Sequence, residues 1–147
     1  MATLERQIRA DTAASRTLGV IMAEVDHFKD IEDSHGHAAG EMALGEFTRR
    51  LFAIIRQSDY LGRYGGVEFL LLVGDTNREQ LMQAAERFRL AITVTPFDVG
   101  AASRHITASF GVALASGGAE PAEAVVAAAD RALYAAKAGG RNRCVFA

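Results

Sequence analysis

The sequence is poor in cysteine, carries little net charge and has no long hydrophobic run, and each shortage excludes a class of protein. The single cysteine, Cys144, cannot form an internal disulfide and suits a reducing compartment. A net charge of −2 excludes a nucleic-acid surface built on bulk positive charge. No apolar run reaches the about 18–20 residues of a membrane span. We therefore expect a cytoplasmic domain with no nucleic-acid partner and no membrane span in this segment.

The residues that are present suit a globular protein. The chain has 147 residues, of which 50% are hydrophobic and 23% are charged. That length fits one domain, and that composition supplies enough apolar side chains for a core. The sequence contains no internal repeat, low-complexity tract or linker, so we expect residues 1–147 to form a single domain.

Apolar periodicity and turn residues predict strands that alternate with helices. Helices are expected over 3–14, 27–31, 38–55, 78–94 and 121–138, and strands over 18–25, 60–64, 68–73, 106–115 and 142–146. The stretch 97–105 is expected to be a polar connection. Together the elements predict an α/β (α+β) fold, in which a mixed central sheet of about five strands is wrapped by helices.

Hydrophobic side chains at three-to-four spacing predict which helix faces are buried. Helix 38–55 carries the stripe Met42, Leu44, Phe47, Leu51, Ile54 and Ile55, and helix 78–94 carries Leu81, Ala85, Phe88 and Ile92. We also expect Phe110 and Tyr134 in the core. Asn77 or the preceding Thr76 is expected to cap the helix that follows.

A Gly-Gly pair lies between two strand-like runs, in the stretch from Arg63 to Phe69. Glycine accepts the positive φ angles of a tight hairpin turn, so Gly65 and Gly66 predict a hairpin. The missing side chains also let a bulky ligand approach the backbone. Glu68 follows as a charge at the mouth of an otherwise apolar strand.

Six motifs in register, from Leu18 to Val145, resemble the GGDEF domain, the diguanylate cyclase module of bacterial signalling. They are Glu24–Lys29, Asp33–His37, Gly40–Glu41, Arg63–Phe69, Thr107–Gly111 and Ala129–Lys137, with Gly140–Arg143 closing the series. The resemblance implies a five-stranded sheet similar to that of nucleotide cyclases, within a longer signalling protein. It also implies an activity that condenses two GTP molecules into cyclic di-GMP.

The catalytic motif departs from the family at its metal ligands. Family members hold Mg²⁺ with a carboxylate matched here by Glu24 and with the third residue of the hairpin motif, which here is Val67. Valine cannot ligate a metal, whereas Mg²⁺ requires oxygen ligands. Glu68 lies one residue further along the strand, so its side chain points to the opposite face. We expect Glu24, Gly65, Gly66, Val67 and Glu68 to be the remnant of a catalytic site, with Glu24 a doubtful metal ligand.

The residues at the family's guanine-reading positions also differ from those of the family, whereas the phosphate-binding positions keep basic residues. An Asn and an Asp that read guanine in the family are matched by Glu32 and Glu41, and an ionised Glu32 lacks the donor of an amide. The resemblance assigns phosphate contacts to basic residues, whose alternative role is ordinary surface charge near helix ends. The expected remnant of the nucleotide site is Phe28, Lys29, Glu32, Glu41, Lys137 and Arg141. Mg²⁺ is expected only if GTP still binds.

An Arg-x-x-Asp pair, Arg56 and Asp59, stands five residues before the Gly-Gly pair. Many members of the family bind their own product at this position. Arg87 or Arg89, on the next expected helix, could supply a second arginine, and Arg87 fits the family position better. A guanidinium can fork onto a guanine edge or a phosphate, and a carboxylate accepts guanine N–H groups. The alternative is an exposed pair at i and i+3, which is worth little.

These motifs predict a catalytically degenerate GGDEF domain that acts as a cyclic di-GMP receptor through Arg56, Asp59 and Arg87. Binding would change its contacts with a neighbouring regulatory domain or a second copy. Two alternatives remain: an interaction or dimerisation module that binds no nucleotide, and a weak cyclase or GTP-sensing domain that uses Glu24 and Glu68 in an altered arrangement.

Overall fold

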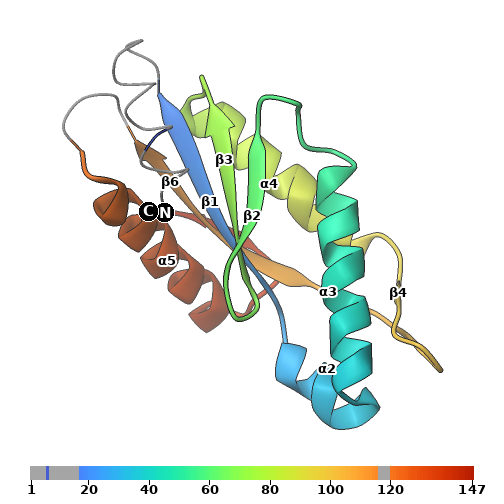
Figure 1. The fold of residues 1–147 in the computed structure, drawn as a ribbon. Coiled ribbons are helices and arrows are strands. Elements are labelled where there is room, and N and C mark those ends of the chain that lie inside the picture. The colour runs from blue at the N-terminus through green and yellow to red at the C-terminus, as the bar shows by residue number, and fades with distance from the viewer. Residues whose placement is uncertain (1–5, 7–16, 116–119) are drawn as a thin grey trace.

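The computed structural model describes residue 6, residues 17–115 and residues 120–147. Its centre is a five-stranded sheet with the strand order β2-β3-β1-β6-β7 (Figure 1). The middle strand β1 (Leu18–Val25) pairs antiparallel with β3 (Glu68–Gly74) on one side and with β6 (Ala108–Ala115) on the other.

The two outer strands differ in direction. β2 (Tyr60–Gly65) forms a hairpin with β3, and β7 (Cys144–Phe146) runs parallel to β6. One parallel pair in an otherwise antiparallel sheet makes it mixed, and helices cover both faces. The predicted fold class is therefore confirmed.

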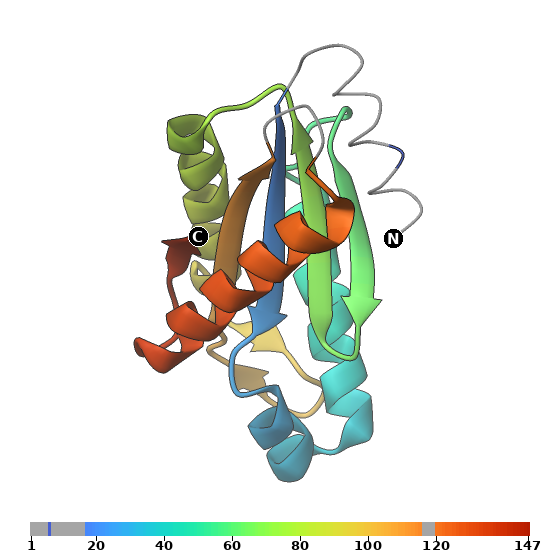
Figure 2. The same ribbon diagram turned by 90° about the vertical axis from the view of Figure 1, so that its left-hand side faces the viewer.

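Helices lie on both sides of the sheet, as the two ribbon views show (Figures 1 and 2). One face is covered by α3 (His37–Phe52) and α4 (Arg78–Thr93), and α2 (Phe28–His35) follows the end of β1. The opposite face is covered by α5 (Ala122–Ala138). The sheet thus separates two hydrophobic clusters, a larger one under α3 and α4 and a smaller one under α5.

The apolar run of β1 follows from its position between the two clusters. Ile21 and Ala23 belong to the larger cluster, whereas Val20 and Met22 belong to the smaller one. A strand buried on both faces needs apolar residues at consecutive positions. The run ends where the polar residues Glu24 and Asp26 begin, and this end of the sheet carries the charged groups described below.

A buried arginine joins α3 to α4. Arg50 is 8% exposed, and its guanidinium carbon lies 4.0 Å from the centre of the Phe97 ring. It donates to backbone carbonyl oxygens at the end of α4 and just beyond, those of Ala91, Ile92, Thr95 and Pro96, at 2.9–3.3 Å. Because the last turn of α4 contains no basic residue of its own, this side chain supplies the donors that the helix end lacks.

Several predicted boundaries agree with the structure. The strand 18–25 is confirmed, and the hairpin strands and helix 78–94 are each within one residue of their predicted ends. The Asn77 side chain caps α4, because its Oδ1 accepts a hydrogen bond from the Gln80 backbone N–H at 2.9 Å. The four hydrophobic residues predicted for the buried face of α4 are all buried.

Other predictions were wrong in detail. Helix 38–55 ends at Phe52, and its residues Met42 and Ile54 are exposed, as is Tyr134 on α5. The short helix predicted over 27–31 extends from Phe28 to His35. Residues 106, 107, 142 and 143 precede the strands in which they were placed.

The predicted polar connection 97–105 contains a small two-stranded sheet. It consists of β4 (Phe97–Asp98) and β5 (Ser103–Arg104), and Phe97 is fully buried beneath Arg50. The helix predicted over 3–14 lies outside the described residues except for residue 6. Among the described helices, none has both the length and the apolar composition needed to cross a bilayer.

Candidate functional site

The structure brings Arg56, Asp59 and Arg87 together around one hollow. This hollow has a volume of about 230 Å³ and lies between α4 and the segments that precede and follow the hairpin. Arg56 and Asp59 come from the loop between α3 and β2, whereas Arg87 comes from the third turn of α4. Residues 31 positions apart in the chain therefore face one cavity. The full lining is Arg56, Asp59, Val73, Thr76, Gln80, Gln83, Ala84 and Arg87.

Arg56 and Asp59 also bond to each other. The Asp59 carboxylate accepts from the Arg56 backbone N–H at 3.0 Å and from its Nη2 at 3.3 Å. The side chain of Asp59 is 5% exposed, whereas that of Arg56 is 56% exposed. The ordinary i, i+3 pair weighed from the sequence is thus present. It leaves most of the guanidinium accessible for a ligand.

Three polar residues that line the hollow, Thr76, Gln80 and Gln83, were not predicted from the sequence as site residues. Gln80, Gln83 and Arg87 recur at three- and four-residue spacing, so α4 presents them on one side. Amide and hydroxyl groups both donate and accept hydrogen bonds. The helical spacing from Arg87 was the signal that could have identified the glutamines.

Two of the residues predicted to be a catalytic remnant, Glu24 and Glu68, lie together at the end of β1, on the face that α5 covers. Glu24 is the direct cross-strand partner of Glu68. Lys137 reaches them from the last turn of α5, and its Nζ lies 3.1 and 3.2 Å from the two carboxylate oxygens of Glu24. The Glu68 side chain points to the opposite face of the sheet from Val67, as expected. On that face it lies beside Glu24, its cross-strand partner.

Like charges act on Glu68. Burial raises its pKa above the ordinary value, and the carboxylates of Asp130 and Glu24 raise it further, while Lys137 opposes the shift. Asp130 lies seven residues, about two helical turns, before Lys137 on α5. It was not predicted as a site residue. We name Glu24, Glu68, Asp130 and Lys137 the strand-end cluster.

The metal ion implied by the family does not fit the residues present. Val67 is half-buried and packs against the larger hydrophobic cluster, and it provides no ligand atom. Glu24 is already paired with a lysine. The described part of the chain contains no group of three or more His, Cys, Asp or Glu side chains that could hold a metal.

A strained turn follows α5 and carries Arg141. Arg141 and Asn142 have φ angles of 65° and 48°, in the left-handed region that non-glycine residues rarely adopt. The buried Asp26 accepts from the Asn142 backbone N–H at 3.0 Å and from the hydroxyls of Thr107 and Ser109 at 2.6 Å. Asp26 thus ties the turn to β1 and β6, and it fixes Arg141 next to the end of the helix that carries Lys137.

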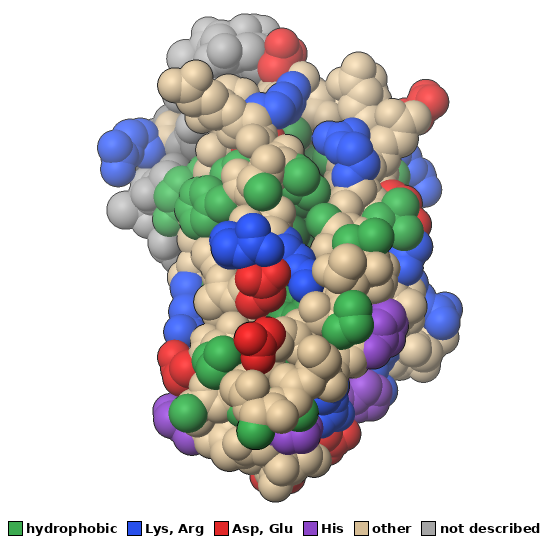
Figure 3. Space-filling view, turned by 90° about the vertical axis from the view of Figure 1, so that its right-hand side faces the viewer, with side chains coloured by type: hydrophobic (Ala, Val, Ile, Leu, Met, Phe, Trp, Pro, Cys, Tyr) green, Lys and Arg blue, Asp and Glu red, His purple; other side chains and the backbone are tan. Residues whose placement is uncertain are grey.

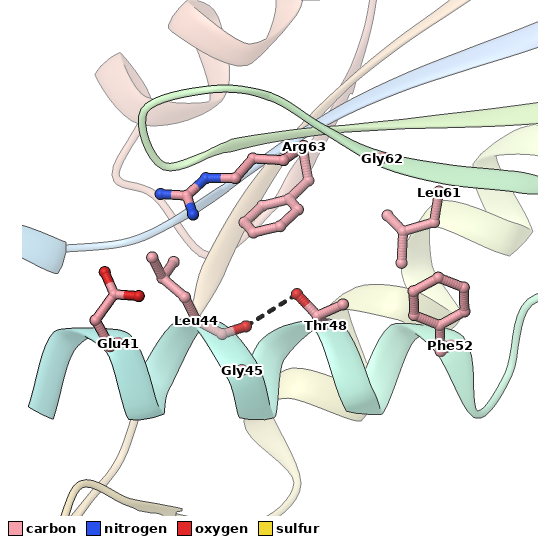
Figure 4. A pocket seen from close by; sticks show the side chains of 9 residues that line it. Glu41, Leu44, Gly45, Thr48, Phe52, Leu61, Gly62 and Arg63 are labelled. Atoms are coloured by element: carbon pink, nitrogen blue, oxygen red, sulfur yellow. Dashed lines mark hydrogen bonds between the residues drawn. The ribbon is translucent and has the colours of Figure 1, made fainter. Parts of the chain in front are cut away.

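A second cavity, of about 440 Å³, lies between α3 and the hairpin (Figure 4). Leu44, Phe52, Leu61 and Phe69 give it apolar walls. Figure 4 shows Arg63 extending along its upper side toward the end where Glu41 projects from α3. The Arg63 Nε also donates to the Gly66 carbonyl at 2.7 Å, and so holds the hairpin tip. Gly66 alone of the glycine pair has a positive φ, 52°.

The remaining nucleotide-site predictions fall around α2 and the start of α3. The imidazole of His37 lies 3.0 Å from a Glu32 oxygen and 3.9 Å from a Glu41 oxygen, so the two matched guanine-reading positions are neighbours. Phe28 is half-buried against the larger cluster, and Lys29 is exposed on α2. These residues are therefore near one another, but they lie apart from the hollow around Arg56.

Charge on the side of the molecule that carries α3 is mixed. Figure 3 shows acidic, basic and hydrophobic side chains interspersed on this face, with no extended area of one sign. The exposed large hydrophobic residues of α3 and α4 include Met42, Phe52 and Leu90, and Val94 directly follows α4.

Comparison with known proteins identifies the family. Residues 1–143 match the family model described as "Diguanylate cyclase, GGDEF domain". Diguanylate cyclase A of Treponema denticola is 35% identical over 136 residues, which are 92% of this chain and 37% of that protein. The response regulator PleD of Caulobacter vibrioides is 35% identical over 144 residues, 97% of this chain and 32% of that protein. The chain thus spans about a third of the length of these two relatives.

A solved structure has the same fold. The coiled coil and GGDEF domain of DgcB from Caulobacter crescentus, solved in complex with c-di-GMP, superimposes with a TM-score of 0.92 at 26% identity. The match covers 99% of this chain and 78% of that one. The family match over nearly the whole sequence, together with this shared architecture, shows that the chain belongs to the GGDEF domain family of diguanylate cyclases.

Proposed function

We propose that this chain is a catalytically degenerate GGDEF domain that binds cyclic di-GMP in the hollow around Arg56, Asp59 and Arg87. The observation that carries the proposal is the convergence of two arginines and a buried carboxylate on one cavity, from segments 31 residues apart. The DgcB domain, solved with c-di-GMP, has the same fold, which supports the choice of ligand.

The chemistry of the hollow suits this ligand. Cyclic di-GMP has two phosphates and two guanines, and a guanidinium can pair bidentately with either group. The Asp59 carboxylate accepts from guanine N1–H and N2–H₂, and Gln80 and Gln83 add neutral donors and acceptors. Opening part of the Arg56–Asp59 pair costs little, because Arg56 is exposed to solvent.

The residue at position 67 supports the loss of catalysis. Cyclic di-GMP synthesis in the family needs metal ions on the triphosphate, and metals stabilise charge on the attacking and leaving oxygens. Here position 67 offers a valine, which provides no ligand atom. In the proposed role the domain acts in the cytoplasm as part of a longer signalling protein, and ligand binding alters its contacts with a neighbouring domain or a second copy.

Calorimetric titration of cyclic di-GMP tests the proposal. We expect wild type to bind, and Arg56→Ala and Arg87→Ala each to weaken binding about 10- to 100-fold, as the loss of a charged hydrogen-bonding partner predicts. Arg131→Ala, which removes an exposed arginine of α5, should bind as wild type does. Absence of heat at two temperatures would contradict the receptor function, since enthalpy can vanish at one temperature only.

Incubation with GTP and Mg²⁺ or Mn²⁺ tests the second part. We expect no cyclic di-GMP to form. Formation that disappears in Glu24→Ala would show instead that the site is a working cyclase with an altered arrangement of carboxylates.

A further inference from the structure

A threonine at the start of β1 holds the turn that leads from β3 into α4. Thr17 directly precedes β1, and its hydroxyl accepts from the Thr76 backbone N–H at 3.2 Å and donates to the Thr76 carbonyl oxygen. The Thr17 carbonyl oxygen accepts from the Asp75 backbone N–H at 2.9 Å. We name Thr17, Asp75 and Thr76 the entry latch.

The latch forms where the pairing of β1 with β3 ends. The last pair of that ladder is Leu18 with Gly74, at the start of β1 and the end of β3 (Figure 1). Asp75 then turns the chain with a φ angle of 51°, in the left-handed region. Thr76 is only 8% exposed, so its backbone groups need partners within the protein. The Thr17 hydroxyl serves both of them, whereas a valine of nearly the same shape would serve neither.

The turn that the latch holds is part of the hollow. Thr76 lines the hollow, whereas Thr17 is not among the lining residues. The next residue, Asn77, caps α4, the helix that supplies the other side of the hollow. Arg56 reaches the same turn from the opposite direction, because its Nη2 donates to the Gly74 carbonyl at 3.4 Å. A residue outside the hollow thus fixes the segment that touches both its arginine and its helix.

We infer that Thr17 is a positioning residue of the cyclic di-GMP site, and that the entry latch couples ligand binding to the start of β1. Residues 1–16 precede Thr17 in the chain, so the latch is a point at which they can act on the hollow. A ligand that bridges Arg56 and α4 holds the turn in place and favours the closed latch. Linkage makes the effect reciprocal, so that opening the latch weakens binding by the same factor. The inference rests on the proposed function and adds to it the residue through which the site is controlled.

Calorimetric titration of cyclic di-GMP into the full chain tests the inference. Thr17→Val removes the hydroxyl and should weaken binding about tenfold, within the range usual for coupled sites. Thr17→Ser keeps the hydroxyl and should bind as wild type does. Thr93→Val is the matched control, because the Thr93 hydroxyl also bonds to backbone carbonyl oxygens, at the far end of the same helix. Circular dichroism establishes that each variant is folded at the titration temperature, so that a general loss of stability leaves the affinity unchanged.

Amide hydrogen exchange in wild type, resolved by nuclear magnetic resonance, provides a measurement that needs no substitution. The Thr76 N–H is donated to Thr17, so its exchange rate reports the opening of the latch. Saturating cyclic di-GMP should slow this exchange about tenfold, by the same linkage. The Val94 N–H, which donates to the Leu90 carbonyl at the other end of α4, should exchange at an unchanged rate.

Each outcome decides the inference. Weaker binding by Thr17→Val, with binding kept by Thr17→Ser and Thr93→Val and slower exchange at Thr76, supports it. A folded Thr17→Val that binds as tightly as wild type overturns it and leaves the receptor function standing, as does an equal loss in Thr17→Ser or an unchanged exchange rate at Thr76. If Thr17→Val does not fold, the exchange measurement decides. Wild type that binds no cyclic di-GMP overturns the receptor function itself, and the inference with it.

Discussion

Replacement of Arg50 by methionine should destabilise the domain by about 3 kcal/mol. Methionine keeps much of the apolar contact but removes every donor that the guanidinium supplies to the end of α4. One acceptor, the carbonyl of Ile92, is buried together with its donor, and an unsatisfied buried acceptor costs about 1–3 kcal/mol.

Two further losses add to this cost. The contact with the Phe97 ring, at 4.0 Å, is worth about 0.5–2 kcal/mol. The charge at the carboxyl end of α4 is worth about 0.3–1 kcal/mol. Because neighbouring interactions do not simply add, we expect about 3 kcal/mol in total. For a domain of this size, that loss lowers the melting temperature by about 6–12 °C.

Urea denaturation followed by circular dichroism measures the free energy of unfolding. Arg49→Met is the matched control, because Arg49 adjoins Arg50 and bonds to the same Glu46 but is 68% exposed. The control should lose only a small part of what Arg50→Met loses. Equal losses would refute the reasoning, since they would show that the carbonyl contacts of Arg50 contribute nothing beyond its pairing with Glu46.

Three other predictions concern the strand-end cluster, the α3 ion pairs and the packing of α5. Burial and like charges raise the pKa of Glu68, so its ionised form costs stability at pH 7. Glu68→Gln should therefore have a higher melting temperature than wild type at pH 7. The difference should vanish below about pH 4, where the carboxyl is protonated in the folded and unfolded states alike. Hydrogen bonds from Arg49 and Arg50 lower the pKa of Glu46 from 4.5 to about 2. The stabilising contribution of Glu46 is therefore complete above pH 4.5 and is lost as the pH falls toward 2. The unfolding free energies of wild type and Glu46→Gln should converge over that interval, and a constant difference would contradict the assignment. A Cβ at Gly111 would collide with backbone atoms of α5, whereas one at Gly45 meets nothing within 4 Å. Thermal melts should show severe destabilisation or loss of folding for Gly111→Ala. Gly45→Ala should raise the free energy of unfolding by about 0.5–1 kcal/mol.

Local chemistry explains the parts of the fold that the sequence predicts. The continuous apolar run of β1 is a direct result of burial on both faces, and the Asn77 cap needs only neighbouring backbone atoms. Met42 and Ile54 were wrongly placed in the core because periodicity gives the direction of a face but not how much of it another element covers. Phe97 was missed because Arg50, from a distant helix, buries it.

The site shows the same division. The Arg-x-x-Asp motif was visible in the sequence, since its residues are three positions apart. Glu68 lies beside Glu24 because of the register in which β1 pairs with β3. The alternation of side chains along a single strand does not reveal that register. The pairing of Lys137 with Glu24 joins residues 113 positions apart, so only the assembled sheet shows it.

The order of strands in the sheet has a consequence for how the two sites come into being during folding. Every residue that lines the hollow lies between Arg56 and Arg87, in the loop before the hairpin, the second hairpin strand, the turn after it and α4. The strand-end cluster instead requires α5 to reach β1, which joins Lys137 to Glu24 across 113 positions of the chain. Closing so long a loop costs more chain entropy and slows folding. We therefore expect the hollow around Arg56 to assemble early and the cluster around Lys137 to form last.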